Sequence, residues 1–413
     1  MLQWASQFQE MVWLESNGHR TNYQSYDEIL AVDALTSLKT DYTNAFDSLK
    51  EYQQQTGDWL FGYLSYDLKN DVEALSSGNA DGLDFPDLYF FQPKKIISIK
   101  GKRVEFNYLN MVADEIESDF KKISQLNINP DTGANGAEIK IKLRIFKDAY
   151  YSQVQKMLAH IYRGDIYEAN FCQEFFAEQT VIDPLKIYNR LNNISKAPFA
   201  AFIRMEDKYL LSASPERYLR KEGNLVISQP IKGTAKRSSH PLEDLKHKND
   251  LKQDTKERAE NIMIVDLVRN DLSKSALKGS VAVEELCEVY SFEQVHQMIS
   301  TITARVTENK NPVDIIRETF PMGSMTGAPK VSAMKIIEEL EATKRGLYSG
   351  AVGYISPENN FDFNVVIRSI LYNHSNQFVS YSVGSAITSR ASPEKEYEEC
   401  LLKAKAMRQV LEA

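Results

Sequence analysis

Two stretches of the sequence each carry a pair of glutamates at a spacing that suits metal binding. The pairs are Glu257 with Glu260 and Glu396 with Glu399. Residues three apart lie on one face of a helix, so four carboxylates converge if two such faces meet. An all-oxygen site with few protein ligands suits Mg²⁺, which keeps water molecules and takes substrate oxygens as further ligands. Either pair alone is more commonly part of a solvated helix face, and the spacing does not show that the helices touch.

Two further residues have the chemistry of a nucleophile and of an acid. Lys232 lies in QPIKGT at the end of a predicted strand, where Gly233 permits close approach of a ligand and Thr234 adds a hydroxyl donor. A lysine held there, desolvated or facing another cation, can lose its proton near neutral pH and become a nucleophile. Glu216 follows Ser214-Pro215, which holds its carboxyl in a fixed direction, as a general acid requires. A solvated lysine and a surface glutamate are the alternative interpretations.

The segment PMGSMTGAPK, from Pro321 to Lys330, precedes a predicted helix and is rich in glycine and hydroxyl residues. Backbone amides at a helix start bind anions, and Ser324 and Thr326 add donors. The pattern GxxxxGK[ST] of nucleotide-hydrolysing phosphate loops is absent, and a tight structural turn is the alternative. Arg368 lies in the predicted strand NVVIRSI among apolar residues, where a charge needs an anionic partner.

Helices that position these residues can be predicted from caps and periodicity. Asp148 is predicted to cap a helix that Gly164 ends. The segment DTKERAENIMIVDLVRND is predicted to be a helix, and the closing helix begins with Ser392 as its cap and Pro393 at its first position. We expect His296 on an amphipathic helix, where a histidine is more often a satisfied core residue than a ligand.

Strands are predicted between these helices. In IYEANFCQEF, strand alternation places Glu168 and Asn170 on one face. The segment YLLSASPERYLRKEGNLVISQPIKGT predicts two or three strands, joined by a hairpin at Glu222-Gly223-Asn224. Three segments are expected along the chain: an N-terminal region over residues 1–126, a polar linker over 127–137, and a catalytic unit over 138–413.

Composition excludes several classes of protein. The 413 residues include 49 Lys and Arg against 57 Asp and Glu, which gives a net charge of −8 and argues against a nucleic-acid partner. No apolar run approaches the roughly 18 residues of a membrane span, and the first twenty residues lack the apolar stretch of a secretory signal. We therefore expect a cytoplasmic protein without a membrane partner. The three cysteines lack a CxxC pair and are predicted to be reduced thiols.

Seven motifs, taken in order, resemble those of the chorismate-utilising enzymes, the family of anthranilate, aminodeoxychorismate, isochorismate and salicylate synthases. They are SPERYL, PIKGTAKR, ERAENIMIVDLVRNDL, PMGSMTGAPKVSAM, GLYSGAVGYI, VVIRSI and SPEKEYEECLLKAKAM, and they cover nearly all of residues 148–413. The resemblance implies an α+β fold, an α/β sandwich of two large, mostly antiparallel sheets with outer helices. It also implies that residues 1–126 resemble the N-terminal domain of anthranilate synthase component I.

The resemblance also implies roles for individual residues. Glu260 and Glu399 resemble the Mg²⁺ ligands, with Glu257 and Glu396 as supporting carboxylates, and Glu216 resembles the acid that protonates the departing C4 hydroxyl of chorismate. The matched positions that receive the substrate's carboxylates or line its ring site are Gly233, Thr234, His296, Ser324, Tyr348, Arg368, Lys403 and the turn Gly384-Ser385-Ala386. The family's turn is Gly-Ala-Gly, so Ala386 departs from it.

Two positions indicate which reaction the resemblance implies. Isochorismate and salicylate synthases carry a water-activating lysine where this chain has Glu168, so water addition is disfavoured; amino-transferring relatives usually have glutamine there. Lys232 matches aminodeoxychorismate synthase component I, whereas anthranilate synthases have alanine. The implied reaction is attack of Lys232 at C2, loss of the C4 hydroxyl, and ammonia attack at C4 to give 4-amino-4-deoxychorismate for 4-aminobenzoate and folate synthesis. Anthranilate synthase component I and a catalytically silent binding protein are the alternatives.

The ammonia implies a partner. In this family it commonly comes from a glutamine amidotransferase subunit whose cysteine nucleophile lies in a glycine-flanked elbow, and Cys172, Cys287 and Cys400 have no such setting. We therefore expect a separate amidotransferase chain or free ammonia. The segment WLES, Trp13 to Ser16, resembles the tryptophan-pocket motif of the family's feedback-regulated members, and is equally interpreted as a helix-to-strand junction.

Overall fold

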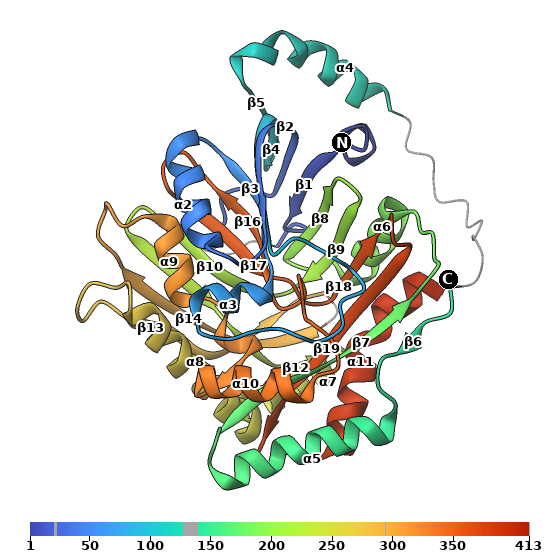
Figure 1. Ribbon diagram of the computed structural model, residues 1–413, viewed down its shortest axis with the longest axis vertical. Coiled ribbons are helices and arrows are strands. Elements are labelled where there is room, and N and C mark those ends of the chain that lie inside the picture. The colour runs from blue at the N-terminus through green and yellow to red at the C-terminus, as the bar shows by residue number, and fades with distance from the viewer. Residues whose placement is uncertain (20–22, 127–138, 294, 413) are drawn as a thin grey trace.

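The computed structural model describes residues 1–19, 23–126, 139–293 and 295–412 (Figure 1). The predicted linker over 127–137 lies outside the described residues. Strands of this part of the chain pair antiparallel in every ladder, and they are β1 Glu10–Glu15, β2 Glu28–Thr40, β3 Leu60–Leu64, β4 Leu88–Lys100, β5 Arg103–Tyr108, β6 Lys142–Leu143, β7 Glu168–Ala177, β8 Phe199–Met205, β9 Lys208–Ser214, β10 Arg217–Glu222, β11 Leu225–Gln229, β12 Ile231–Lys236, β13 Ala282–Ser291, β14 Val295–Arg305, β15 Gly327–Ala328, β16 Ala351–Ile355, β17 Phe361–Val365, β18 Ser369–Asn373 and β19 Phe378–Thr388.

The helices lie mostly outside the strands, with α5, α7, α8, α10 and α11 gathered in the lower part of Figure 1. The α-helices are α1 Leu2–Ala5, α2 Ala45–Thr56, α3 Lys69–Val72, α4 Ile116–Gln125, α5 Lys147–Arg163, α6 Pro184–Ser195, α7 Pro241–Gln253, α8 Thr255–Ser273, α9 Pro312–Thr319, α10 Lys330–Leu340 and α11 Pro393–Glu412. Short 3₁₀ turns are η1 Tyr66–Leu68, η2 Asn110–Glu115 and η3 Gly323–Met325. Among the described residues, no helix is long and apolar enough to cross a membrane.

The strands form two arms that share the long strand β4. The first arm runs β5-β4-β2-β1-β8-β9-β18-β19-β7, and the second runs β4-β3-β16-β17-β10-β11-β14, with β12 and β13 on β14. The predicted α+β sandwich is confirmed, but its two sheets are joined through β4 into one hydrogen-bonded network. Strands from residues 1–126 and from 138–413 pair directly, β1 with β8 and β3 with β16.

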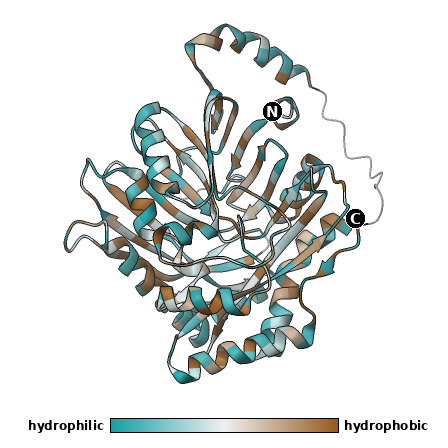
Figure 2. Ribbon diagram, viewed as in Figure 1, coloured by the Kyte–Doolittle hydropathy of each residue, from teal (hydrophilic) through white to brown (hydrophobic). Residues whose placement is uncertain are grey.

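Two large apolar cores hold this arrangement. One lies between the arms and includes Phe61, Phe90 and Phe363, all with no exposed surface. The other lies between the first arm and helices α5, α6, α10 and α11, and includes Val154 and Tyr381. Figure 2 shows brown, apolar residues along the central strands and alternating teal and brown bands on α5, which is the pattern of a helix with one buried face. Burial of these faces fixes the helices that carry the site.

Local signals predicted most elements correctly. Helix α5 ends at Gly164, whose φ of 90° is left-handed, and β10 and β11 form the predicted hairpin around Gly223. Three predictions were wrong. Phe146, not Asp148, is the N-cap of α5; His296 lies in strand β14, not on a helix; and Gly384-Ser385-Ala386 is part of strand β19, not a turn. For His296 and for Gly384-Ser385-Ala386, long-range strand pairing decides the conformation.

Candidate active site

The amine of Lys232 lies near several carboxylates. It is in the second position of β12, and its side chain is 12% exposed. Its Nζ lies 3.2 Å from Glu168 Oε1, which comes from the start of β7. Burial lowers the pKa of Lys232, but the charges of Glu168 and Glu260 outweigh burial and raise it. The expectation of an amine that faces a cation and deprotonates by itself near neutral pH is therefore wrong for this arrangement.

Glu216 has the surroundings of a general acid. It lies between β9 and β10, as predicted, and is 4% exposed. Burial raises the pKa of Glu216 to about 7, against the smaller lowering effects of a hydrogen bond with Ser324 and of the Lys232 charge. A carboxyl with this pKa is protonated in a useful fraction of molecules near neutral pH and can donate that proton. The structure thus brings Glu216, Ser324 and Lys232 into one electrostatic cluster.

Helix α8 carries the first glutamate pair toward the same cluster. Asp254 caps the helix, since its carboxylate accepts hydrogen bonds from the amides of Lys256 and Glu257 at 2.9 and 3.0 Å. Glu260 is on the buried face of α8. Burial raises its pKa to about 7, although the charges of Lys232 and Lys256 lower it. Glu260 Oε1 is buried without a hydrogen-bond partner, so this oxygen is available to a ligand.

Helix α11 carries the second pair, and a lysine connects the two helices. Lys256 Nζ lies 3.7 Å from Glu260 Oε1 and 3.9 Å from Glu396 Oε1. Glu399 pairs with Lys403 at 2.5 Å, one turn along α11. Burial raises the pKa of Glu257, with a further upward contribution from Glu399. The four predicted ligands therefore do face a common region.

These carboxylates fit a divalent cation in chemistry. In the part of the chain that the structure describes, no three His, Cys, Asp or Glu side chains are already arranged to hold a metal ion, and Lys256 lies between Glu260 and Glu396. The unpartnered oxygens of Glu260 and Glu168 offer hard donors. Mg²⁺ needs few protein ligands because it keeps water and takes substrate oxygens. In chemical type, this set of carboxylate donors suits Mg²⁺.

Among the described residues, no carboxylate forms an ion pair within 4 Å with the guanidinium of Arg368. Arg368 precedes β18 with a left-handed φ of 53°, a strained conformation for a residue other than glycine. The one side-chain hydrogen bond that it makes among the described residues is a long one, from Nη1 to the carbonyl of Lys403 at 3.4 Å. Burial lowers the pKa of Arg368, although nearby Tyr348 and Glu399 act in the opposite direction. A positive group held in this way is suited to a substrate carboxylate.

Gly233 follows Lys232, and its lack of a side chain lets Glu257 and Leu251 pack close to the backbone. Its φ is 88°, and a Cβ built on it would lie 3.1 Å from Glu257 Oε2 and 3.2 Å from Leu251 Cδ1.

We expect Gly233→Ala to lower the free energy of unfolding by about 1–2 kcal/mol, the cost of a left-handed alanine, and also to lower kcat/KM. Gly279→Ala is the matched control, because its φ is 76° but its Cβ would meet nothing within 4 Å. Denaturant unfolding and steady-state kinetics measure both effects; equal kcat/KM for the two variants would contradict the prediction.

Two predicted site residues, His296 and Ser385, have hydrogen-bond partners within the protein. His296 is a satisfied core residue, with Nε2 3.0 Å from Asp244 Oδ1 and Nδ1 2.9 Å from Ser291 Oγ. The hydroxyl of Ser385 lies 3.3 Å from Tyr150 Oη on the helix side of β19. Ser385 also forms a hydrogen bond with the carboxyl of Glu396. Burial raises the pKa of Glu396, and the hydrogen bond from Ser385 lowers it.

The other residues predicted to contact the substrate differ in their exposure and in their partners. Tyr348 is 4% exposed, and its Oη lies 3.7 Å from Cys172 Sγ. Lys403 Nζ donates to the carbonyl of Gly384 at 2.8 Å, which ties α11 to β19. Thr234 is exposed, and Ala386 pairs with Asn170 across β19 and β7. The sequence-based prediction missed Lys256, although its spacing of four residues from Glu260 is a recognised ion-pair signal.

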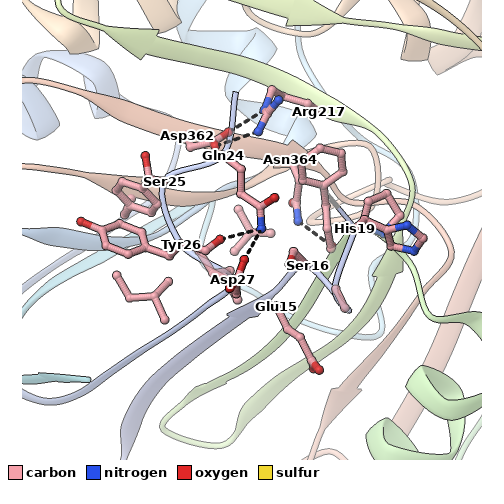
Figure 3. Close-up of a pocket in the computed structure, with 17 residues that line it drawn as sticks. Glu15, Ser16, His19, Gln24, Ser25, Tyr26, Asp27, Arg217, Asp362 and Asn364 are labelled. Carbon is pink, nitrogen blue, oxygen red and sulfur yellow. Dashed lines mark hydrogen bonds and ion pairs between the residues drawn. The ribbon is translucent and has the colours of Figure 1, made fainter. Parts of the chain in front are cut away.

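A second pocket of about 70 Å³ lies on another face of β10 (Figure 3). Ser16 and Glu15 of the WLES segment line it, together with Arg217, which pairs with Asp362 at 2.9 Å. Arg217 is the first residue of β10 and lines this pocket, whereas Glu216 lies in the connection just before the strand. WLES is in strand β1 and the loop after it, so the junction between a helix and a strand is not observed. A tryptophan-like ligand here stays a prediction.

The amino-acid sequence is similar to those of known proteins. The sequence profile of the chorismate binding enzymes matches residues 9–409. The chain is 36% identical to the probable chloroplastic aminodeoxychorismate synthase of Oryza sativa over 88% of its own length and 44% of that protein's. It is also 33% identical to the anthranilate synthase component I-like protein of Synechocystis, covering 89% of this chain and 76% of the relative. The chain thus spans less than half of the rice relative's length.

The fold has close structural neighbours. Anthranilate synthase component I from Streptococcus pneumoniae superposes with a TM-score of 0.80 and 26% identity, covering 95% of this chain and 94% of the other. The menaquinone-specific isochorismate synthase MenF of Escherichia coli shares the fold, with a TM-score of 0.78 at 16% identity. With a profile match over almost the whole sequence, the chain belongs to the family of chorismate binding enzymes.

Proposed function

We propose that this enzyme transfers ammonia to C4 of chorismate and forms 4-amino-4-deoxychorismate. The observation that carries the proposal is the buried amine of Lys232, 3.2 Å from Glu168 and electrostatically coupled to the acid Glu216. Relatives named aminodeoxychorismate synthase support it, including component 1 of Bacillus subtilis at 32% identity over 85% of this chain. The product would serve 4-aminobenzoate and folate synthesis.

The proposed reaction has two displacements. Lys232 first gives a proton to Glu168, the acceptor 3.2 Å away. The neutral amine then forms a bond to C2, the C4–O bond breaks, and Glu216 protonates the hydroxyl so that it leaves as water. Ammonia next forms a bond to C4, the bond from C2 to Lys232 breaks, and the released amine recovers its proton from Glu168. The ammonium formed at C4 returns one proton to Glu216, which balances the cycle.

Substrate binding follows from the charges. Arg368 has no carboxylate partner in the described part of the chain and is suited to one carboxylate of the dianionic substrate. Glu260 and Glu399, supported by Glu257 and Glu396, would hold Mg²⁺. When bound, Mg²⁺ would neutralise negative charge on a substrate carboxylate. Lys403 keeps Glu399 in place through their ion pair.

The ammonia source is also a proposal. Cys172, Cys287 and Cys400 are all buried free thiols, which does not suit the exposed nucleophile of a glutaminase. We propose that a separate glutamine amidotransferase chain supplies ammonia, and that ammonium salt replaces it in the test tube. An assay with chorismate, MgCl₂ and ammonium chloride, with the product identified by mass, tests the function.

Anthranilate synthase component I is the second candidate, because relatives with that name include the Thermus thermophilus protein at 32% identity over 86% of this chain. The product separates the two activities. Retention of the enolpyruvyl group identifies aminodeoxychorismate synthase, whereas pyruvate released with anthranilate identifies the alternative. A catalytically silent protein would form neither product under saturating ammonia.

Lys232→Ala tests the covalent step. Wild type incubated with chorismate and no ammonia is expected to gain the mass of chorismate minus one water, whereas Lys232→Ala should gain nothing, because the attacking nitrogen is absent. Lys236→Ala is the control, since Lys236 is an exposed residue of the same strand, and it should keep the adduct. Intact-protein mass spectrometry measures all three. An adduct that persists in Lys232→Ala would exclude Lys232 as the nucleophile.

A further inference from the structure

Lys256 lies where the four proposed metal-binding carboxylates meet. Its ammonium is 3.7 Å from Glu260 Oε1 on its own helix and 3.9 Å from Glu396 Oε1 on α11. The charges of Glu257 and Glu399 also act on it. We propose that Lys256 is an internal competitor of Mg²⁺, which neutralises these carboxylates when the metal is absent and leaves their common space when it binds. This inference rests on the metal site of the proposed function.

The contacts of Lys256 make it easy to displace. Both distances exceed the range of a hydrogen bond, so charge and not directional bonding holds the ammonium. Lys403 is held differently, since it lies 2.5 Å from Glu399 and donates to the carbonyl of Gly384 at 2.8 Å. The side chain of Lys256 is 44% exposed, so its ammonium can turn into water. A divalent cation therefore displaces Lys256 without breaking any directional bond.

The carboxylates need such a partner when no metal is present. Glu260 is 8% exposed and its Oε1 has no hydrogen-bond donor, and Glu396 is 3% exposed. Buried carboxylates that face one another repel and lose hydration, unless a positive charge is near. Among the described residues, Lys256 places its ammonium within 4 Å of a carboxylate on each of the two helices. It thus stabilises the metal-free protein and, for the same reason, weakens the binding of Mg²⁺.

Calorimetric titration with MgCl₂ tests this inference in the full-length protein. We expect Lys256→Gln to bind Mg²⁺ about 10-fold more tightly than wild type, because a competing charge is gone. Lys256→Arg keeps the charge and should stay within about 2-fold of wild type. Lys252→Gln is the matched control. It removes the same charge at a similar exposure of 48%, but its partner is Glu288 at 2.9 Å, so the affinity should not change.

Thermal unfolding gives a second measurement. Without Mg²⁺, Lys256→Gln should melt at a lower temperature than wild type, and saturating Mg²⁺ should remove the difference. The inference is overturned if Lys256→Gln binds Mg²⁺ no more tightly than Lys252→Gln, or if none of the proteins binds it. Product formation by wild type at saturating Mg²⁺ is measured in parallel. Product together with unchanged affinity in Lys256→Gln rejects the inference alone, whereas absence of an amino product rejects the proposed function.

Discussion

Glu216→Gln is expected to lower kcat/KM for amine transfer to chorismate by about 10²–10⁴-fold, the usual contribution of a general acid. Glutamine is close in size to glutamate but has no acidic proton for the departing hydroxyl. Burial raises the pKa of the Glu216 carboxyl to about 7. Steady-state kinetics with varied chorismate, saturating MgCl₂ and saturating ammonia measure the loss.

The pH profile distinguishes this role from a structural one. The acid acts in its protonated form, so activity is present below the pKa of about 7 and lost as pH rises through it. Above that point kcat/KM should fall about 10-fold per pH unit, and Glu216→Gln should lack this decline. Ammonia must be saturating throughout, because its free-base fraction rises with pH. Glu222 is an exposed residue at the end of β10, the strand that follows Glu216, and Glu222→Gln should keep the wild-type profile. A decline that survives in Glu216→Gln would assign it to another group.

Arg368→Gln is expected to raise KM for chorismate by roughly 100-fold, because truncating one partner of a desolvated charge pair costs about 2–5 kcal/mol or more. The melting temperature should not fall. In the protein without substrate, the side chain of Arg368 makes one long hydrogen bond to a described residue, and the backbone has a left-handed φ of 53°, so removal of the guanidinium loses little stabilisation. Kinetics and thermal unfolding on the same preparation measure both values.

Arg408→Gln is the control for Arg368. Arg408 is also an arginine near α11, but it is 47% exposed and pairs with Glu412 at 2.8 Å. Its replacement should leave KM unchanged. If Arg368→Gln binds chorismate as well as Arg408→Gln does, the carboxylate-binding role of Arg368 is refuted. If instead Arg368→Gln is strongly destabilised, Arg368 is a structural residue.

Elements with local signals were predictable from the sequence. Helix α8 has Asp254 as a capping residue and α11 has Pro393 at its first position. Gly164 and Gly223 supply left-handed conformations that end a helix and turn a hairpin. These features depend on a few neighbouring residues, so short-range physics decides them.

Features set by distant residues were not predictable. His296 has the pattern of an amphipathic segment, but pairing of β14 with β12 and β13 makes it a strand residue. Glycine can adopt many backbone conformations, but ten residue pairs between β19 and β7 keep the segment around Gly384 extended. The joining of the two sheets through β4 depends on strands β2, β3 and β5 together. Strand pairing is non-local, and the sequence pattern of one strand does not name its partner.

In the site too, the residue types were predictable from the sequence, whereas contacts between distant residues were not. Residue types and the family resemblance named Lys232, Glu216 and Glu260, and the structure brings them into one cluster. The ion pair between Lys232 and Glu168 joins residues far apart in the sequence, so no spacing rule reveals it. Its presence reverses the expected direction of the lysine's pKa. The position of Lys256 between two helices was equally invisible, because it depends on how α8 and α11 approach each other.

Pairing of β3 with β16 has a consequence for biosynthesis. Gly62 of β3 lies opposite Gly353 of β16 in that ladder. During translation β3 is therefore made almost 300 residues before its partner β16. At about 5–20 residues per second, this delay is roughly 15–60 s. During that interval β3 can pair with β4 along one edge, where Phe61 lies opposite Phe91, but its other edge has no permanent partner. Chains with so many distant contacts fold slowly and aggregate readily. We therefore expect a nascent polypeptide that depends on chaperones, and poor recovery of active enzyme after dilution from denaturant at high protein concentration.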